Sequence, residues 1–136
     1  MQKYPIREVE GVGDTYEEKL KMSGIETTID LLEKARTTYA RKKLAKNIGI
    51  SEKLILDWAN RADLMRINGI ARQYSDLLEA AGVDTVVELS HRNPENLYEQ
   101  LRGFDVSRSH KVRQKPSKRA IRMWVEQAKQ MERMLE

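Results

Sequence analysis

Residues 9–33 read VEGVGDTYEEKLKMSGIETTIDLLE, and residues 67–91 read INGIARQYSDLLEAAGVDTVVELSH. Aligned at a constant offset of 58, the two stretches share two glycines, a tyrosine, a threonine and two leucines. The matched pairs are Gly11 with Gly69, Tyr16 with Tyr74, Leu20 with Leu78, Gly24 with Gly82, Thr27 with Thr85 and Leu31 with Leu89. The chain therefore contains an internal repeat, and each copy is one supersecondary unit.

Each copy ends in a segment centred on a tryptophan. Trp58 and Trp124 stand at an offset of 66 instead of 58, so the second copy carries about eight additional residues before its tryptophan. We predict two repeats, residues 1–62 and 63–136, with a basic insertion at residues 102–118. We expect the two repeats to be related by a pseudo-twofold axis.

Composition limits the possible functions. The 136 residues suit one domain or two small repeats with a shared core, and the lack of cysteine excludes disulfides and thiolate sites. No charged-then-apolar N-terminal stretch and no long apolar run is present, so we expect a cytoplasmic protein without a membrane span. His91 and His110 form no metal-ligand or nucleophile-base spacing, and no Walker-type glycine loop occurs. We therefore expect no enzyme activity and no cofactor.

The hydrophobic pattern predicts an all-α fold with about five short helices in each copy. Apolar residues recur at spacings of three and four, and no segment alternates with period two. Residues 11–13 end a first short helix after Pro5, and Asp14 is the expected cap of the next helix. The further helices are expected over 14–22, from 27 or 28 to 32, over 40–47 and from Ser51 onward, and then over 72–81, 85–90, 94–101 and 117–134.

Each copy begins with a tight turn of the form hydrophobe-x-Gly-hydrophobe-Gly between two helices. Residues 9–13, Val-Glu-Gly-Val-Gly, match this form fully, and residues 67–71, Ile-Asn-Gly-Ile-Ala, match it except at Ala71. The arrangement resembles the helix-hairpin-helix motif. Nearly the whole chain is similar to a small, functionally uncharacterised prokaryotic family of tandem helix-hairpin-helix repeats, in which the phrases LLEAAGVDTVVEL (77–89) and RNPENLYEQL (92–101) are typical.

This resemblance implies a way of binding but no activity. Helix-hairpin-helix motifs contact duplex DNA through its phosphates without reading sequence, sometimes with a monovalent cation held by loop carbonyls. A turn without Cβ atoms brings backbone N–H groups close to a phosphate, and the following helix adds partial positive charge. The alternative is structural, because the same glycines let two helices cross closely. The candidate hairpin contacts are Gly11, Val12, Gly13, Gly69, Ile70, Ala71 and Arg72.

The two hairpins depart from the motif in different ways. In the first copy, the carboxylates of Asp14, Glu17 and Glu18 oppose a phosphate at the start of the second helix. Glu17 also stands where the motif usually has a small residue. In the second copy, Arg72 supplies a suitable donor, as does Gln73, but an alanine at position 71 is unfavourable if the turn requires positive φ there.

Positive charge is concentrated in one segment, although the net charge of the chain is only +4. Residues 102–122 contain eight Lys and Arg against one Asp, a net charge of +7, whereas residues 63–101 carry −4. This composition predicts an exposed loop that leads into the last helix and could lie along a phosphate backbone. The alternatives are a solvated loop, pairing with the acidic stretch, or an acidic protein partner. The candidate cations are Arg108, Lys111, Arg113, Lys115, Lys118 and Arg119.

A second basic group surrounds the helix expected at 40–47. Residues 44–51 have the pattern Leu-Ala-x-x-x-Gly-Ile-Ser, which resembles part of a helix-turn-helix. The residues that follow, Glu52, Lys53 and Asp57, are poorly suited to reading bases in the major groove. We expect this stretch to be the turn of the repeat itself. The members of the group are Arg36, Arg41, Lys42, Lys43 and Lys46.

The sequence thus predicts a non-enzymatic protein that binds nucleic-acid backbone, in the first place duplex DNA. The basic loop would make most contacts, and the hairpin at Gly69, Ile70 and Arg72 would support it. The competing hypothesis is a protein-interaction module, in which the helix-hairpin-helix geometry serves packing. Trp58 and Trp124 are expected in the core beside Tyr16 and Tyr74, and Phe104 is the first candidate for base stacking.

Overall fold

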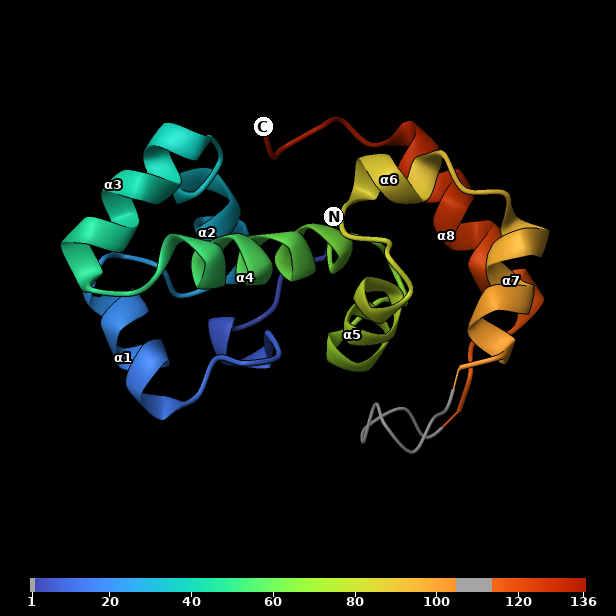
Figure 1. The fold of residues 1–136 in the computed structure, drawn as a ribbon, viewed down its shortest axis with the longest axis horizontal. Helices are drawn as coiled ribbons and strands as arrows, with labels where there is room; N and C mark the ends of the chain where they lie inside the picture. Colours follow the sequence, from blue (N-terminus) through green and yellow to red (C-terminus); the bar gives the residue numbers. More distant parts are fainter. Residues whose placement is uncertain (1, 105–113) are drawn as a thin grey trace.

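The computed structural model describes residues 2–104 and 114–136. These residues form eight α-helices, one 3-10 helix and no strand, which confirms the predicted all-α class. Figure 1 shows two groups of helices, with α4 running between them. The elements are η1 (Ile6–Glu8), α1 (Asp14–Met22), α2 (Thr28–Lys34), α3 (Thr38–Ile48), α4 (Glu52–Leu64), α5 (Arg72–Ala80), α6 (Val86–Ser90), α7 (Pro94–Arg102) and α8 (Lys118–Gln130).

The helices α1–α4, here called the first half, and α5–α8, the second half, follow one plan. α1 and α5 have 9 residues each, and α4 and α8 have 13 each. Thr27 and Thr85 cap α2 and α6, while Ser51 and Ser117 cap α4 and α8. In every case the hydroxyl accepts a hydrogen bond from the third backbone N–H of the helix, as N-cap residues do.

Three details differ from the sequence prediction. The last helix, expected over 117–134, is α8 and ends at Gln130. The first half has the expected five helices when the 3-10 helix η1 is counted, but the second half has four. In the second half, the equivalent residues 64–66 end α4 and form the turn that follows. Asp14 is also not the cap of α1. It is the first helical residue, because Gly13 has the extended conformation of an N-cap, with φ −91° and ψ −176°.

Each half has its own hydrophobic cluster around a tryptophan. Trp58 is completely buried in the first cluster, and Trp124 is only 3% exposed in the second, which confirms that both are core residues. Tyr16 packs on Trp58 and Tyr74 on Trp124, each pair with ring centroids 5.1 Å apart. Tyr16 is nevertheless 36% exposed, so the tyrosines lie at the edge of the core and not inside it.

The turns at residues 9–13 and 67–71, predicted as hairpins and called so here, each place their first glycine directly over the tryptophan of their half. A Cβ atom at Gly11 would be 3.1 Å from Nε1 of Trp58, and one at Gly69 would be 3.0 Å from Nε1 of Trp124. Both glycines also have positive φ, +97° and +94°. Ala71 has φ −114° and is the N-cap of α5, so its methyl group causes no left-handed strain. The glycine requirement therefore falls on the first glycine of the motif.

A buried ion pair joins the halves at the end of α4. Nη1 of Arg66 is 2.7 Å from Oδ1 of Asp63, and both side chains are 3% exposed. The second carboxylate oxygen of Asp63 accepts a hydrogen bond of 2.8 Å from the backbone N–H of Val86, the first residue of α6. Arg66 also donates to the carbonyl of Glu132, beyond α8, at 2.7 Å. This pair fixes the direction in which the second half leaves α4.

Segments outside the helices cross from one half to the other. The side-chain amide of Gln2 donates to carbonyl oxygens in the turn after α4, with the shortest distance, 2.6 Å, to Ile67. After α8 the chain returns to the first half, where Leu135 is buried in the first cluster. The guanidinium of Arg41 donates to the carbonyl of Glu136 at 2.8 Å. The two halves are therefore held together by more than the single helix between them.

Replacing Gly11 with alanine should lower the free energy of unfolding by about 2 kcal/mol or more, because positive φ and the indole both oppose a Cβ atom. Gly13→Ala is the matched control, since no atom lies within 4 Å of its Cβ position. We expect it to cost less than about 1 kcal/mol. Urea unfolding followed by circular dichroism measures both losses. Equal losses would contradict a requirement for glycine over the tryptophan.

Candidate nucleic-acid interface

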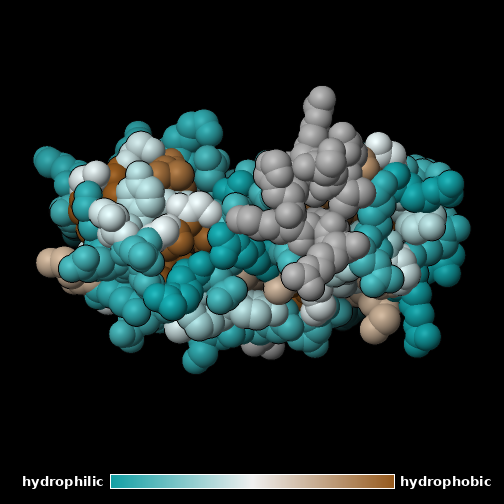
Figure 2. Space-filling model, turned by 90° about the horizontal axis from the view of Figure 1, so that it is seen from below, coloured by the Kyte–Doolittle hydropathy of each residue, from teal (hydrophilic) through white to brown (hydrophobic). Residues whose placement is uncertain are grey.

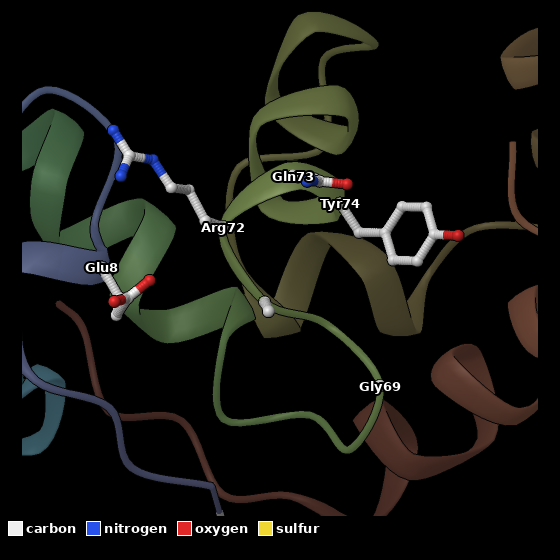
Figure 3. Close-up of a pocket in the computed structure, with 6 residues that line it drawn as sticks. Glu8, Gly69, Arg72, Gln73 and Tyr74 are labelled. Carbon is white, nitrogen blue, oxygen red and sulfur yellow. The ribbon is translucent and has the colours of Figure 1, made fainter. Parts of the chain in front are cut away.

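A hollow of about 500 Å³ lies at the start of α5, next to the second hairpin. Gly69, Ala71 and Gln73 are exposed to solvent there. Figure 3 shows the side chain of Arg72 extending to one side of the hollow and that of Tyr74 to the other. The lining residues are Glu8, Gly69, Ala71, Arg72, Gln73 and Tyr74.

The N-terminus of α5 is chemically unlike most of the others. Among the described α-helices, α2, α3, α4, α6, α7 and α8 each have a Ser, Thr or Asn side chain that accepts a hydrogen bond from the first turn. Only α1 and α5 begin without one, at Gly13 and Ala71, and these are the two helices that follow the hairpins. Within residues 2–104 and 114–136, no side chain accepts a hydrogen bond from the first turn of either helix, and the helix dipole there favours an anion.

The two hairpins meet through an ion pair. Nε of Arg72 lies 2.6 Å from Oε2 of Glu10, which belongs to the turn of the first hairpin. Arg72, predicted as a phosphate contact, thus has its charge balanced by an acid that sequence reasoning did not place there. Glu8 adds a second carboxylate to the hollow. An anion at α5 has to compete with Glu10 for this guanidinium.

The start of α1 is more acidic than that of α5. Glu17 is 7% exposed and accepts two hydrogen bonds from Arg7, 2.9 and 2.8 Å long. Lys21 lies 3.4 Å from the same carboxylate. Hydrogen bonding by Arg7 lowers the pKa of Glu17 to about 2. The charge of Glu17 is therefore balanced within the fold, while those of Asp14 and Glu18 remain on the exposed surface of α1.

The described part of the basic segment contacts α5 at Gln114 and α7 at the residues that follow. The hydroxyl of Tyr74 donates to the carbonyl of Gln114 at 3.0 Å, which holds the chain before α8 against the second hairpin. Lys118 and Arg119 form the first turn of α8 and are exposed. Lys118 Nζ lies 5.5 Å from the ring centroid of Tyr98.

The other predicted cations are placed differently. Lys115 is half-buried and donates to the carbonyl of Arg102. Arg108, Lys111 and Arg113 lie outside the described residues. Phe104, the candidate for base stacking, is partly buried against the second cluster. The contacts thus place Lys115 and Lys118 beside α7, while Gln114 lies against Tyr74 of α5.

Figure 2 shows the face that is lowest in Figure 1. Its described surface is mostly hydrophilic, and most of the apolar surface lies on the side of the first half. On this face the first half therefore combines apolar and hydrophilic side chains.

A family model described as "Domain of unknown function (DUF4332)" matches residues 10–131. The chain belongs to this family. No curated protein and no solved structure matches it. Within the described residues of this DUF4332 domain, no three His, Asp or Glu side chains gather where they could hold a metal ion. Nor is any helix in those ranges long and apolar enough to cross a membrane.

The ion pair at Glu17 predicts an acid-dependent loss of stability in the DUF4332 domain. Because folding lowers the pKa of Glu17, its contribution is complete above the unfolded carboxyl pKa of about 4.3 and is lost as the pH falls toward 2. Glu17→Gln should lower the melting temperature at neutral pH, and the difference from wild type should shrink as the pH falls. Thermal melts across this range, with the exposed Glu18→Gln as control, measure the effect. A difference that does not change with pH would be inconsistent with this ion pair.

Proposed function

We propose that this protein binds nucleic-acid backbone, in the first place duplex DNA, without reading its sequence and without catalysis. In this proposal the two halves are helix-hairpin-helix repeats related by a pseudo-twofold axis. The main contacts are made by the second hairpin and the first turn of α8. The observation that carries the proposal is that α1 and α5, the helices after the hairpins, are the described α-helices without a side-chain cap.

Main-chain donors explain why phosphate is the favoured ligand. The first-turn N–H groups of α5 are uncapped, and the adjoining residues Gly69 and Ala71 are exposed. A phosphate oxygen accepts such hydrogen bonds and is attracted by the partial positive charge of the helix start. Because every nucleotide carries a phosphate, contacts of this kind position the protein without selecting a sequence.

Side-chain cations supply the longer-range attraction. Lys118 and Arg119 are exposed at the start of α8, and the chain before them is held against Tyr74 of the second hairpin. The predicted contacts Arg108, Lys111 and Arg113 belong to the same segment of the sequence. Each phosphate neutralised releases counterions, so affinity should fall with salt with a log-log slope of roughly −0.9 per contact.

The first hairpin contributes less to this proposal. Gly11, Val12 and Gly13 have the complete motif, and α1 lacks a side-chain cap as α5 does. The exposed carboxylates of Asp14 and Glu18 nevertheless disfavour an anion at its start. We therefore assign the principal phosphate contact to the second hairpin.

Neutralising Lys118 and Arg119 together, as K118Q/R119Q, should weaken duplex binding and reduce the salt slope by up to about 2, because each contact contributes roughly 0.9. Fluorescence anisotropy of a labelled duplex, titrated at several salt concentrations, measures both quantities. The matched control is K42Q/K46Q, which removes the same charge from exposed positions on α3. Equal effects of the two double variants, or an unchanged slope in K118Q/R119Q, would remove the start of α8 from the interface.

The ion pair between Glu10 and Arg72 allows a test in which duplex binding should become stronger. Glu10→Gln should increase duplex affinity several-fold, because it removes a competing carboxylate 2.6 Å from Arg72. Gln73→Glu should decrease it, because it places a carboxylate in the first turn of α5. The same anisotropy titration measures both, and Gln130→Glu, at the far end of α8, is the control for added charge. Weaker binding by Glu10→Gln would argue against a phosphate at this helix start.

A further inference from the structure

A groove separates the end of α1 from α3 in the first half. It consists of two hollows, of about 250 and 440 Å³, that share Ser23 and Asn47 and are therefore continuous. In Figure 1, α1 and α3 lie at the end of the molecule away from the second half. The residues that line the groove are Lys19, Met22, Ser23, Lys34, Ala40, Lys43, Leu44, Asn47 and Ile48.

The groove offers apolar surface to a ligand. Met22 is 82% exposed, an unusual state for a large hydrophobic side chain. Leu44 belongs to the first hydrophobic cluster, and Ile48 packs against it. Both line the hollows, so the groove reaches down to the core of the first half.

Lysines supply every ionisable side chain that lines the two hollows. These are Lys19, Lys34 and Lys43, and no ion pair involves them within the described ranges 2–104 and 114–136. Lys34 lies near the end of α1, with Cε 3.5 Å from the Cβ position of Gly24. Beyond Met22 a neighbouring hollow is mainly acidic, with Asp14, Glu17 and Glu18 in its lining and Lys21 paired with Glu17. The α3 side of Met22 is therefore the side on which the charges are all positive.

The equivalent place in the second half is bridged by side chains. Arg92, 58 residues after Lys34, lies 3.3 Å from the carbonyl of Gly82 and 3.4 Å from the amide oxygen of Gln100. Gln100 donates to the carbonyl of Ala81 at 2.9 Å. Counted from the caps Thr37 and Asn93, Gln100 occupies the position of Leu44.

This bridge cannot form in the first half. A leucine at position 44 has no polar atom with which to bridge to the end of α1. The second half also has Glu99 at the position of Lys43, so it lacks the uniform positive charge. The open, lysine-lined groove is therefore a property of the first half and not of the repeated fold.

We propose that this groove binds an acidic segment of a partner protein. Apolar side chains of the segment pack on Met22, Leu44 and Ile48, and its carboxylates meet the lysines. A nucleic-acid backbone fits less well, because phosphates and sugars offer no apolar group for the floor. The surface is distinct from the second hairpin, so the protein would bind nucleic acid with one half and a protein with the other.

The probe for this proposal is a short fluorescent peptide with leucines at helical spacing among glutamates. We expect saturable anisotropy, and in ¹⁵N-labelled protein shifts of the Ser23 and Asn47 amide signals. K34E/K43E should weaken binding by about tenfold or more. K42E/K46E has the same charge change outside the hollows and should have a much smaller effect. A peptide with serine in place of leucine should bind more weakly than the probe.

A second variant closes the groove without removing charge. K34R/L44Q introduces the bridge of the second half, and it should weaken peptide binding while duplex binding is unchanged. Thermal melts of each variant check that the fold is retained. Any one of three results overturns the proposal. The first is no saturable peptide binding, and the second is an equal loss of peptide binding in K34E/K43E and K42E/K46E. The third is that the duplex displaces the peptide and K34E/K43E also binds the duplex more weakly.

Discussion

The packing of a hairpin glycine on a tryptophan indole is the contact on which each half of the structure depends. Gly11 lies on Trp58 and Gly69 on Trp124, at nearly the same separation and the same φ. The indole is buried, so the loop has to cross it without a Cβ atom. This crossing places the start of the next helix at the surface with an extended Gly13 or Ala71 before it. These helix starts have no side-chain cap because glycine and alanine carry no acceptor.

The junction at Asp63 and Arg66 decides how the two halves face each other. A buried ion pair is not strong evidence for stability, but this one holds both of its side chains in one geometry. By holding the start of α6 and the chain after α8, it brings the second hairpin against the first, where Arg72 meets Glu10. This ion pair links the two turns, because an anion bound at the start of α5 would compete with Glu10 of the first turn for Arg72.

The two halves share a plan but have diverged at their surfaces. In the first half, acids surround the start of α1, and an open groove lined by lysines lies between α1 and α3. In the second half, Arg92 and Gln100 close the equivalent groove, and cations gather at the start of α8. Copies that keep the same core packing and differ in their exposed side chains thus present two different surfaces to solvent.

The sequence by itself determined the helical class, the matched tryptophan cores and the position of both glycine turns, because periodicity and glycine placement are local properties. It did not identify which glycine of the turn has no room for a Cβ atom, since that depends on the distance from Gly11 to Trp58, far along the chain. Nor did it show that Glu10 pairs with Arg72, or that Lys34 and Leu44 leave a groove which Arg92 and Gln100 close. Those contacts join residues from different helices, so only the packing of the helices decided them.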